Sequence, residues 1–256
     1  MERLLVERQG WVRVLTVNRP DAHNCIDAET AVAIAGAIEE FARDPDARVL
    51  VVTGAGPLSF SSGADLKHTQ ALWGHESFEE AGPLGFARLD PGKPTIAAVN
   101  GYCFAGGMEL AAWCDFRVAA ENAEFGILNR RWGVPLIDGG TQRFTRILGL
   151  GNALYLIETG VRLDARRAQA LGFVQEVVPE GQALPRALEL AARIAEYPQA
   201  SLRSDRQAAA ASLGLPLREG LLFERHLGAV TLGDPEMTEA LQRFARGERP
   251  EPPRPR

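Results

Sequence analysis

The sequence predicts an α/β protein with a helical C-terminal region. Apolar runs of strand length alternate with segments of helical periodicity as far as Val178. From Gln182 onward the pattern is helical throughout, with breaks at Pro198, Pro216 and Pro235. We therefore divide the chain into a core over residues 1–197 and a helical region with a loose, proline-rich tail over residues 198–256.

The composition excludes several classes of protein. The 28 basic and 33 acidic residues leave a net charge of −5, which gives no electrostatic reason to expect a nucleic-acid partner. The N-terminal residues mix charges and lack a signal sequence, and no apolar run approaches the length that spans a bilayer. The four histidines are too scattered for a metal site, and the three cysteines form no C-x-x-C pair. We expect a cytoplasmic protein with no metal and no membrane partner.

The N-terminal third is predicted to contain a hairpin, a helix and a buried strand. Residues 4–7 and 12–17 are strands around a Gln9-Gly10 turn. Asp27 is suited to cap a helix that runs to about Arg43, and residues 48–53 form a buried strand. A Gly- and Ser-rich loop over residues 54–63 precedes a short helix that opens over residues 64–67. Residues 69–90 are weakly patterned, and we expect mobile helical pieces there that could act as a lid.

The remaining elements of the core follow the same alternation. Residues 95–99 form a buried strand, residues 100–102 a turn, and Gly106-Gly107 starts an apolar helix that runs to Trp113. Residues 115–119 form a strand, and a short strand starts at Phe125-Gly126. Helical segments are expected from Gly139-Gly140 to about Glu158 and over 164–171, and a strand over 173–178.

The glycine pair and the carboxylate of Glu109, a few residues after it, point to chemistry on a carbonyl group. Backbone N–H groups beside glycines at a helix start are free to bind a developing negative charge. Glu109 lies inside the apolar helix, where a charge is costly unless it is paired, solvated or used. Its structural alternative is a pair with a neighbouring Arg. Asp138 is the second candidate, and it could also cap the helix after Gly139.

Other catalytic motifs are weak or missing. Gly54-Ala55-Gly56 follows a strand, but Ser59 occupies the place of the third glycine in a dinucleotide-binding loop. The serines at 59, 61 and 62 lack a G-x-S-x-G context. These patterns favour neither nucleotide binding nor a serine hydrolase.

Several segments together resemble the crotonase superfamily, that is, the enoyl-CoA hydratase/isomerase family. The likeness covers nearly the whole chain with sensible spacing. Its segments are NRPDAHNCID (18–27), VLVVTGAG (49–56), FSSGADLK (60–67), KPTIAAVNGYCFAGGMELAAWCDFRVAAENAEFG (93–126), GGTQRFTRILG (139–149) and TGVRLDARRAQALGFVQEVVP (159–179).

The resemblance implies a fold, an assembly and a substrate. The fold would be a crotonase-like spiral of repeated ββα units, with C-terminal helices packing at a trimer interface. The chain would form a homotrimer or a hexamer. Its substrate would be an acyl thioester of coenzyme A, which brings the coenzyme as part of the substrate, so that no separate cofactor is expected.

The resemblance also implies two backbone donors and a coenzyme-binding segment. The N–H groups of Ala64 and Gly106 would hold the thioester oxygen as it becomes an enolate. Such preorganised donors suit a developing oxyanion. Pantetheine and adenine would lie along the segment that holds Ser62, Ala64, Asp65, Leu66 and Lys67.

The acid–base residues match the family only in part. Glu109 matches the first glutamate of the hydratases, in their G-G-x-E-L pattern, but the second glutamate falls where this chain has Asn129. Asparagine can orient a water molecule but exchanges no proton at neutral pH. Asp138 resembles an aspartate that other branches of the superfamily place at the acyl group, so Glu109 with Asp138 would be a rearranged acid–base pair.

Three hypotheses follow from this departure. The first is an enoyl-CoA hydratase-like enzyme. The second is another crotonase reaction, namely double-bond isomerisation, decarboxylation, ring formation or thioester hydrolysis. The third is a catalytically poor trimer that binds acyl-CoA.

Overall fold

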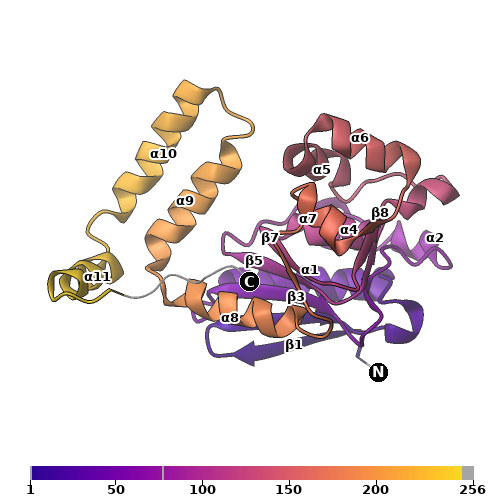
Figure 1. The fold of residues 1–256 in the computed structure, drawn as a ribbon, viewed down its shortest axis with the longest axis horizontal. Coiled ribbons are helices and arrows are strands. Elements are labelled where there is room, and N and C mark those ends of the chain that lie inside the picture. The colour runs from indigo at the N-terminus through magenta and orange to yellow at the C-terminus, as the bar shows by residue number, and fades with distance from the viewer. Residues whose placement is uncertain (1, 77, 250–256) are drawn as a thin grey trace.

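Two sheets form the centre of the protein in the computed structural model, which describes residues 2–76 and 78–249 (Figure 1). The larger sheet has the spatial order β1 (Leu4–Gln9), β2 (Val12–Val17), β3 (Val49–Gly54), β5 (Thr95–Val99), β7 (Phe116–Ala120) and β10 (Glu176–Val178). The smaller sheet has the order β4 (Ser59–Ser61), β6 (Tyr102–Phe104), β8 (Glu124–Gly126) and β9 (Leu163–Asp164). Within the larger sheet every pair except β1–β2 is parallel.

The chain visits the two sheets in turn, which confirms the predicted spiral of ββα units. β3, β5 and β7 belong to the larger sheet, and each is followed directly by a strand of the smaller one, β4, β6 or β8. A helical segment closes each unit. These segments are α2 (Thr69–Leu72) with α3 (Phe78–Ala81), then α4 (Gly106–Trp113), then the 3₁₀ helix η2 (Leu128–Trp132) with α5 (Gly140–Leu148).

Helices cover both faces of the larger sheet. Along β3, Val49 and Val51 face the alanine stripe of α8 (Ala183–Glu196), whereas Leu50 and Val52 face the core that contains α1 (Ala28–Arg43) and α4. Alternate residues of a strand point to opposite faces, and a strand covered on both sides is apolar throughout. This explains why the buried strands were visible in the sequence.

Most of the predicted elements are confirmed near their predicted bounds. The N-terminal hairpin pairs β1 with β2, the Asp27 side chain accepts the N–H of Thr30 at the start of α1, and β5 covers residues 95–99 as predicted. After α5, α6 (Leu150–Thr159) and α7 (Ala165–Ala170) are also helical as predicted.

Three local predictions are wrong. Residues 59–61 form the strand β4 inside the predicted loop over 54–63, and Tyr102, predicted to lie in a turn, starts the strand β6, which was not predicted. A strand of three residues shows no alternation, so only its pairing partner defines it. No helix opens over residues 64–67, because Ala64 forms an isolated bridge with Ile26 and the helix α2 starts at Thr69.

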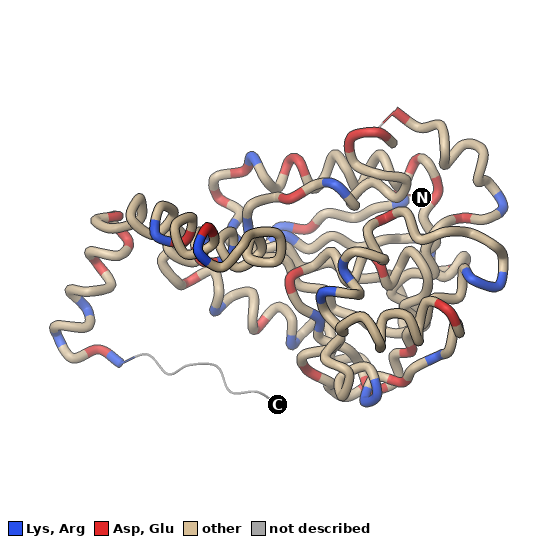
Figure 2. The backbone as a smooth tube through the Cα atoms, turned by 90° about the horizontal axis from the view of Figure 1, so that it is seen from above, with Lys and Arg blue, Asp and Glu red and all other residues tan. Residues whose placement is uncertain are grey.

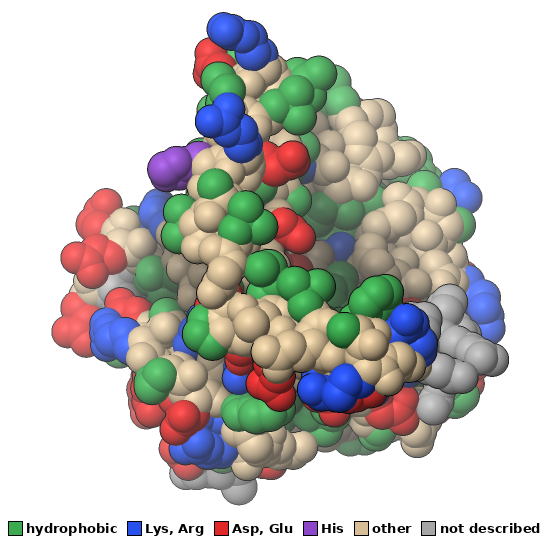
Figure 3. Space-filling model, turned by 90° about the vertical axis from the view of Figure 1, so that its left-hand side faces the viewer, with side chains coloured by type: hydrophobic (Ala, Val, Ile, Leu, Met, Phe, Trp, Pro, Cys, Tyr) green, Lys and Arg blue, Asp and Glu red, His purple; other side chains and the backbone are tan. Residues whose placement is uncertain are grey.

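The C-terminal helices extend away from the sheets (Figure 1). They are α9 (Gln199–Ala211), α10 (Leu217–Thr231) and α11 (Pro235–Ala245), separated at the predicted prolines. Figure 3 looks onto this side and shows hydrophobic side chains gathered along these helices. The exposed large apolar residues within the helices α10 and α11 include Leu217, Leu221, Leu222, Val230, Leu241 and Phe244. The boundary at residue 198 stays a prediction, and residues 250–256 of the predicted tail lie outside the described residues.

The charges of the described residues are mixed in sign. Figure 2 shows basic and acidic residues interspersed along the chain, without a continuous basic stripe. Among the described residues, none of the helices combines the length and the apolar character that crossing a membrane requires.

Candidate active site

A cavity lies between the start of α4, the η2 segment and the loop that follows β4. Its empty volume is about 680 Å³, including the open space at its mouth. The wall is largely apolar and contains Trp73, Leu84, Phe104, Leu128, Trp132, Val134, Pro135 and Ile137. A mostly apolar cavity with a few converging polar groups is the usual form of a small-molecule site.

Most of the residues that the sequence pointed to meet in this cavity. Its wall includes Ser62, Ala64, Leu66, Gly106, Glu109, Asn129 and Asp138. Asp65 and Lys67 do not line it. Asp65 is buried among other polar groups, and Lys67 is exposed to solvent. A role for these residues in binding coenzyme A stays a prediction.

The N–H group of Ala64 is free because of the bridge with Ile26. Ile26 donates its N–H to Gly63 O (2.8 Å), and Asp65 donates its N–H to Ile26 O (2.8 Å). Successive peptide groups of an extended chain point to opposite sides, so the N–H of Ala64 points away from Ile26. Among the described residues this N–H has no hydrogen-bond acceptor.

Gly106 supplies a second free N–H group beside the first. It is the first residue of α4, where no intrahelical acceptor exists. A Cβ atom on Gly63 would lie 2.5 Å from Gly106 N, so the two segments approach too closely for a side chain. The two backbone donors therefore come from adjacent segments in one wall of the cavity.

Ala105 holds the turn before α4 in an unusual conformation. Its φ of 51° and ψ of −122° lie where non-glycine residues are rare. Its N–H donates to Gly126 O (2.8 Å), and its C=O accepts from Met108 and Glu109. Strained residues of this kind persist where the surrounding structure imposes them, often at functional sites. Here the strained residue sets the direction in which the N–H of Gly106 points.

Glu109 is 3% exposed and binds the start of α5. Its Oε1 accepts hydrogen bonds from the N–H groups of Gly140 (2.8 Å) and Asp138 (3.1 Å). Glu109 thus satisfies orphan donors at the start of that helix. The structural alternative, a pair with an Arg, is wrong, since no described residue forms an ion pair with Glu109.

Asp138 is equally buried, and its carboxylate points to another part of the chain. Its Oδ1 accepts the N–H of Leu84 (2.9 Å). The predicted capping role is wrong, because the N-cap residue of α5 is Gly139 and no side chain caps it from that position. Arg143 donates to Asp138 O (3.1 Å) and to Ala87 O (2.7 Å), so the weakly patterned segment is anchored to the site.

The two carboxyl groups have raised and unequal pKa values. Burial raises the pKa of Glu109 to about 8, and the charge of Asp138 adds to the effect, against the hydrogen bonds from Gly140 and Asp138. Burial raises the pKa of Asp138 to about 6, while the N–H of Leu84 and two arginines oppose it. Between these pKa values Asp138 is ionised and Glu109 is protonated. Paired carboxyl groups whose environments separate their pKa values in this way suit base and acid roles.

Asn129 brings an unused acceptor to the cavity wall. Its Nδ2 donates to Val134 O (2.7 Å), whereas its buried Oδ1 has no partner among the described residues. A buried acceptor without a donor is unfavourable, and such groups at a cavity commonly bind a ligand or water. The sequence identified the position but not which amide atom is free.

The apolar part of the site was not predicted from the sequence. Trp73 and Leu84 come from the weakly patterned segment, and the exposed Trp132 comes from η2. An apolar side chain at a cavity mouth carries the same pattern in the sequence as one in the core. The exposure of Trp132, 73%, is the signal that separates the two, and it exists only in the folded chain.

Comparison with known proteins gives one consistent result. Residues 7–252 match the family model described as enoyl-CoA hydratase/isomerase. The chain is 34% identical to a probable enoyl-CoA hydratase of Mycobacterium bovis (98% of this chain, 97% of that protein) and 34% identical to a crotonyl-CoA hydratase of Syntrophomonas wolfei (95% of each). It superposes on an enoyl-CoA hydratase structure from Mycobacterium marinum with a TM-score of 0.91 at 33% identity, over 97% of this chain and 98% of that one.

Proposed function

The chain belongs to the enoyl-CoA hydratase/isomerase family, and from that premise we propose that it adds water to the double bond of a 2-enoyl-CoA thioester, or removes it in reverse. One observation carries the proposal. Two free backbone donors and two buried carboxyl groups with separated pKa values line the same cavity. The substrate class rests on the family, and the roles of individual residues are our assignment.

The N–H groups of Ala64 and Gly106 would hold the thioester oxygen. When the oxygen of water adds to the β-carbon, the electrons of the double bond move toward the thioester oxygen and form an enolate. Preorganised donors in a site that excludes water stabilise such charge more strongly than solvent does. Side chains at these two positions would contribute little.

The two carboxyl groups would carry the proton transfers. Ionised Asp138 takes a proton from a water molecule as the oxygen of that water bonds to the β-carbon. Protonated Glu109 then donates its proton to the α-carbon, which completes the addition of one H and one OH. Transfer of the proton from Asp138 to Glu109 restores the starting state. Each positioned acid or base contributes about 10²–10⁴-fold in rate.

Asn129 favours hydration over the second candidate, double-bond isomerisation. The separated carboxyl pair could also move a proton between carbons. The open Oδ1 of Asn129, however, requires an O–H or N–H donor, which water and a β-hydroxyl group supply and a migrating double bond does not. Hydration is therefore the better-supported reaction.

A panel of acyl-CoA thioesters tests the proposal. Purified protein is incubated with short- and medium-chain 2-enoyl-CoA and 3-enoyl-CoA, and the products are identified by mass spectrometry. We expect hydration of a 2-enoyl-CoA and a fall of at least about 10²-fold in kcat for Glu109→Gln. Double-bond migration alone would select the isomerase. Tight binding without any turnover would leave an acyl-CoA-binding protein.

The exposed apolar side chains of the C-terminal helices support the proposed assembly. Leu217, Leu221 and Leu222 are each more than half exposed on α10. Apolar surface of this kind favours association. We propose a homotrimer or hexamer, which light scattering after size-exclusion chromatography would measure, with Leu221→Asp as the variant expected to dissociate it.

A further inference from the structure

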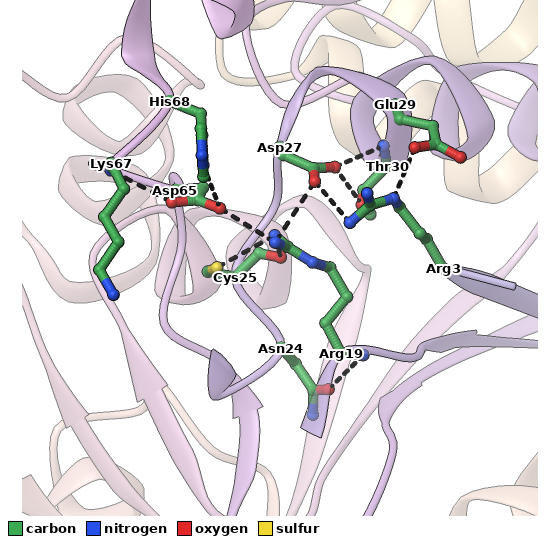
Figure 4. A network of polar contacts seen from close by, with 10 residues as sticks. All are labelled: Arg3, Arg19, Asn24, Cys25, Asp27, Glu29, Thr30, Asp65, Lys67 and His68. Carbon is green, nitrogen blue, oxygen red and sulfur yellow. Dashed lines mark hydrogen bonds and ion pairs between the residues drawn. The ribbon is translucent and has the colours of Figure 1, made fainter. Parts of the chain in front are cut away.

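A partly buried network of ion pairs links Asp27 to Asp65 through Arg19 (Figure 4). Asp27 follows Ile26 and Asp65 follows Ala64, the two residues of the isolated bridge. At its centre the Arg19 guanidinium contacts two carboxylates, with Nη2 at 3.0 Å from Asp65 Oδ2 and at 3.3 Å from Asp27 Oδ2. The same side chain donates from Nη1 to the carbonyl oxygen of Cys25 (2.8 Å). Arg19 thus joins three points of the chain.

One end of the network is anchored to a helix. The Oδ1 of Asp27 accepts from the N–H (3.0 Å) and the hydroxyl (2.7 Å) of Thr30 at the start of α1. A carboxylate in this position is held by the free donors of the helix and by its dipole. Asp27 therefore gives Arg19 a rigid point of attachment.

The other end of the network is the residue that follows Ala64. Asp65 accepts from the N–H of Lys67 through Oδ1 (3.1 Å), while its Oδ2 contacts His68 Nδ1 (3.2 Å) as well as Arg19. Both of its oxygens are engaged by the protein, and its backbone N–H is bound to Ile26 O. Asp65 therefore fixes the position of the loop that follows β4 and contains Ala64.

We propose that Arg19 and Asp65 are positioning residues that fix the N–H group of Ala64 at the oxyanion site. The inference rests on the proposed function. Donors must lie about 2.7–3.1 Å from the oxyanion to stabilise it, so a small shift of this loop weakens the stabilisation. Arg19 ties the loop to the start of α1 and keeps Ala64 N aligned with Gly106 N across the cavity wall.

Two substitutions and a matched control test this role. Arg19→Lys keeps the charge but loses the planar fork that reaches several acceptors, and Asp65→Asn keeps the shape but loses the charge. Because loss of a whole oxyanion donor costs about 10²–10³-fold in kcat, we expect displacement to cost at least about tenfold in kcat, with KM changed less than about threefold. Arg3→Lys is the control, since Arg3 pairs with Asp27 (2.7 Å) and Glu29 but not with Asp65. It should leave kcat unchanged.

A spectroscopic measurement makes the test independent of turnover. Acetoacetyl-CoA carries an enolisable thioester, and an oxyanion site raises its absorbing enolate fraction on binding. We expect the wild-type protein and Arg3→Lys to give this band, and Arg19→Lys and Asp65→Asn to give a weaker band at saturation. Circular dichroism identifies the folded variants, and either folded variant alone decides the outcome.

The outcomes separate this inference from the proposed function. A wild-type enolate band without hydration of any 2-enoyl-CoA would overturn the proposed function and leave the positioning role standing if the variants weaken the band. Wild-type kcat and band in a folded Arg19→Lys or Asp65→Asn protein would overturn the positioning role. The same holds if Arg3→Lys lowers kcat as much as Arg19→Lys, or if the wild-type protein shows no band.

Discussion

Glu109 accepts a hydrogen bond from the backbone N–H of Asp138 at 3.1 Å, while the carboxylate of Asp138 accepts the N–H of Leu84 instead. One acid of the site therefore holds the turn that carries the other. Because Oε1 of Glu109 also accepts the N–H of Gly140, the site and the start of α5 form one unit. Substitutions at either acid will therefore affect both chemistry and local structure.

The pH dependence of activity should show two limits. Asp138 must be ionised and Glu109 protonated, so kcat/KM should rise with pH through about 6 and fall through about 8. Asp138→Asn should lower the maximum and remove the acidic limb while keeping the alkaline one. The measurement is a pH–rate profile at substrate concentrations well below KM. A flat profile between pH 5 and pH 9 in the wild-type protein would contradict the assignment.

The free energy of unfolding should fall as pH rises, because the buried carboxyl group of Glu109 must lose its proton. The folded-state pKa of Glu109 is raised from 4.5 to about 8, so the folded state binds more protons than the unfolded chain. The stabilisation is fully present below pH 4.5 and is lost as pH rises through 8. Glu109→Gln lacks this ionisation, so relative to wild type it should gain a few kcal/mol of unfolding free energy between those limits. Urea unfolding at a series of pH values measures the difference, and a constant difference would refute the shift.

Gly140→Ala should damage the site directly. A Cβ atom there would lie 2.8 Å from Glu109 Oε1 and 2.9 Å from Phe144 Cε2. Overpacking of this kind costs about 1–3 kcal/mol of stability, and displacement of Glu109 should lower kcat at least about tenfold. Gly36→Ala is the control, because nothing lies within 4 Å of its Cβ position and α1 continues through it. It should raise stability by about 1 kcal/mol and leave kcat unchanged.

Asn129→Leu should separate hydration from isomerisation. Loss of the open Oδ1 removes the acceptor that we assign to water, so kcat for hydration should fall by about tenfold, the value of a hydrogen bond of about 1.4 kcal/mol. Migration of a double bond in a 3-enoyl-CoA needs no such acceptor and should change less. The ratio of the two products is the measurement. Equal losses in both reactions, with an unchanged melting temperature, would argue against a role for Asn129 in binding water.

Local patterns were predicted well where the interacting residues are neighbours in the chain. Asp27 and Thr30 form the expected cap, and Gly106 starts α4 as the glycine pair indicated. The prediction that residues 64–67 open a helix failed, because the bridge between Ala64 and Ile26 overrides a weak local preference. A weak local preference for helix does not decide the structure where the backbone can form hydrogen bonds with a distant segment.

The sequence by itself determined the alternation of strands and helices and singled out two candidate carboxylates, whereas the donors at residues 64 and 106 were implied by the family resemblance. Burial and capping act between near neighbours, so they leave periodic patterns that can be read without a structure. Only the tertiary structure decided that Glu109 rather than Asp138 binds the start of α5, and that Oδ1 of Asn129 stays free. Glu109 and Asp138 are 29 residues apart, and Arg19 and Asp65 are 46 apart. Contacts over such separations depend on the path of the whole chain, which no local pattern records.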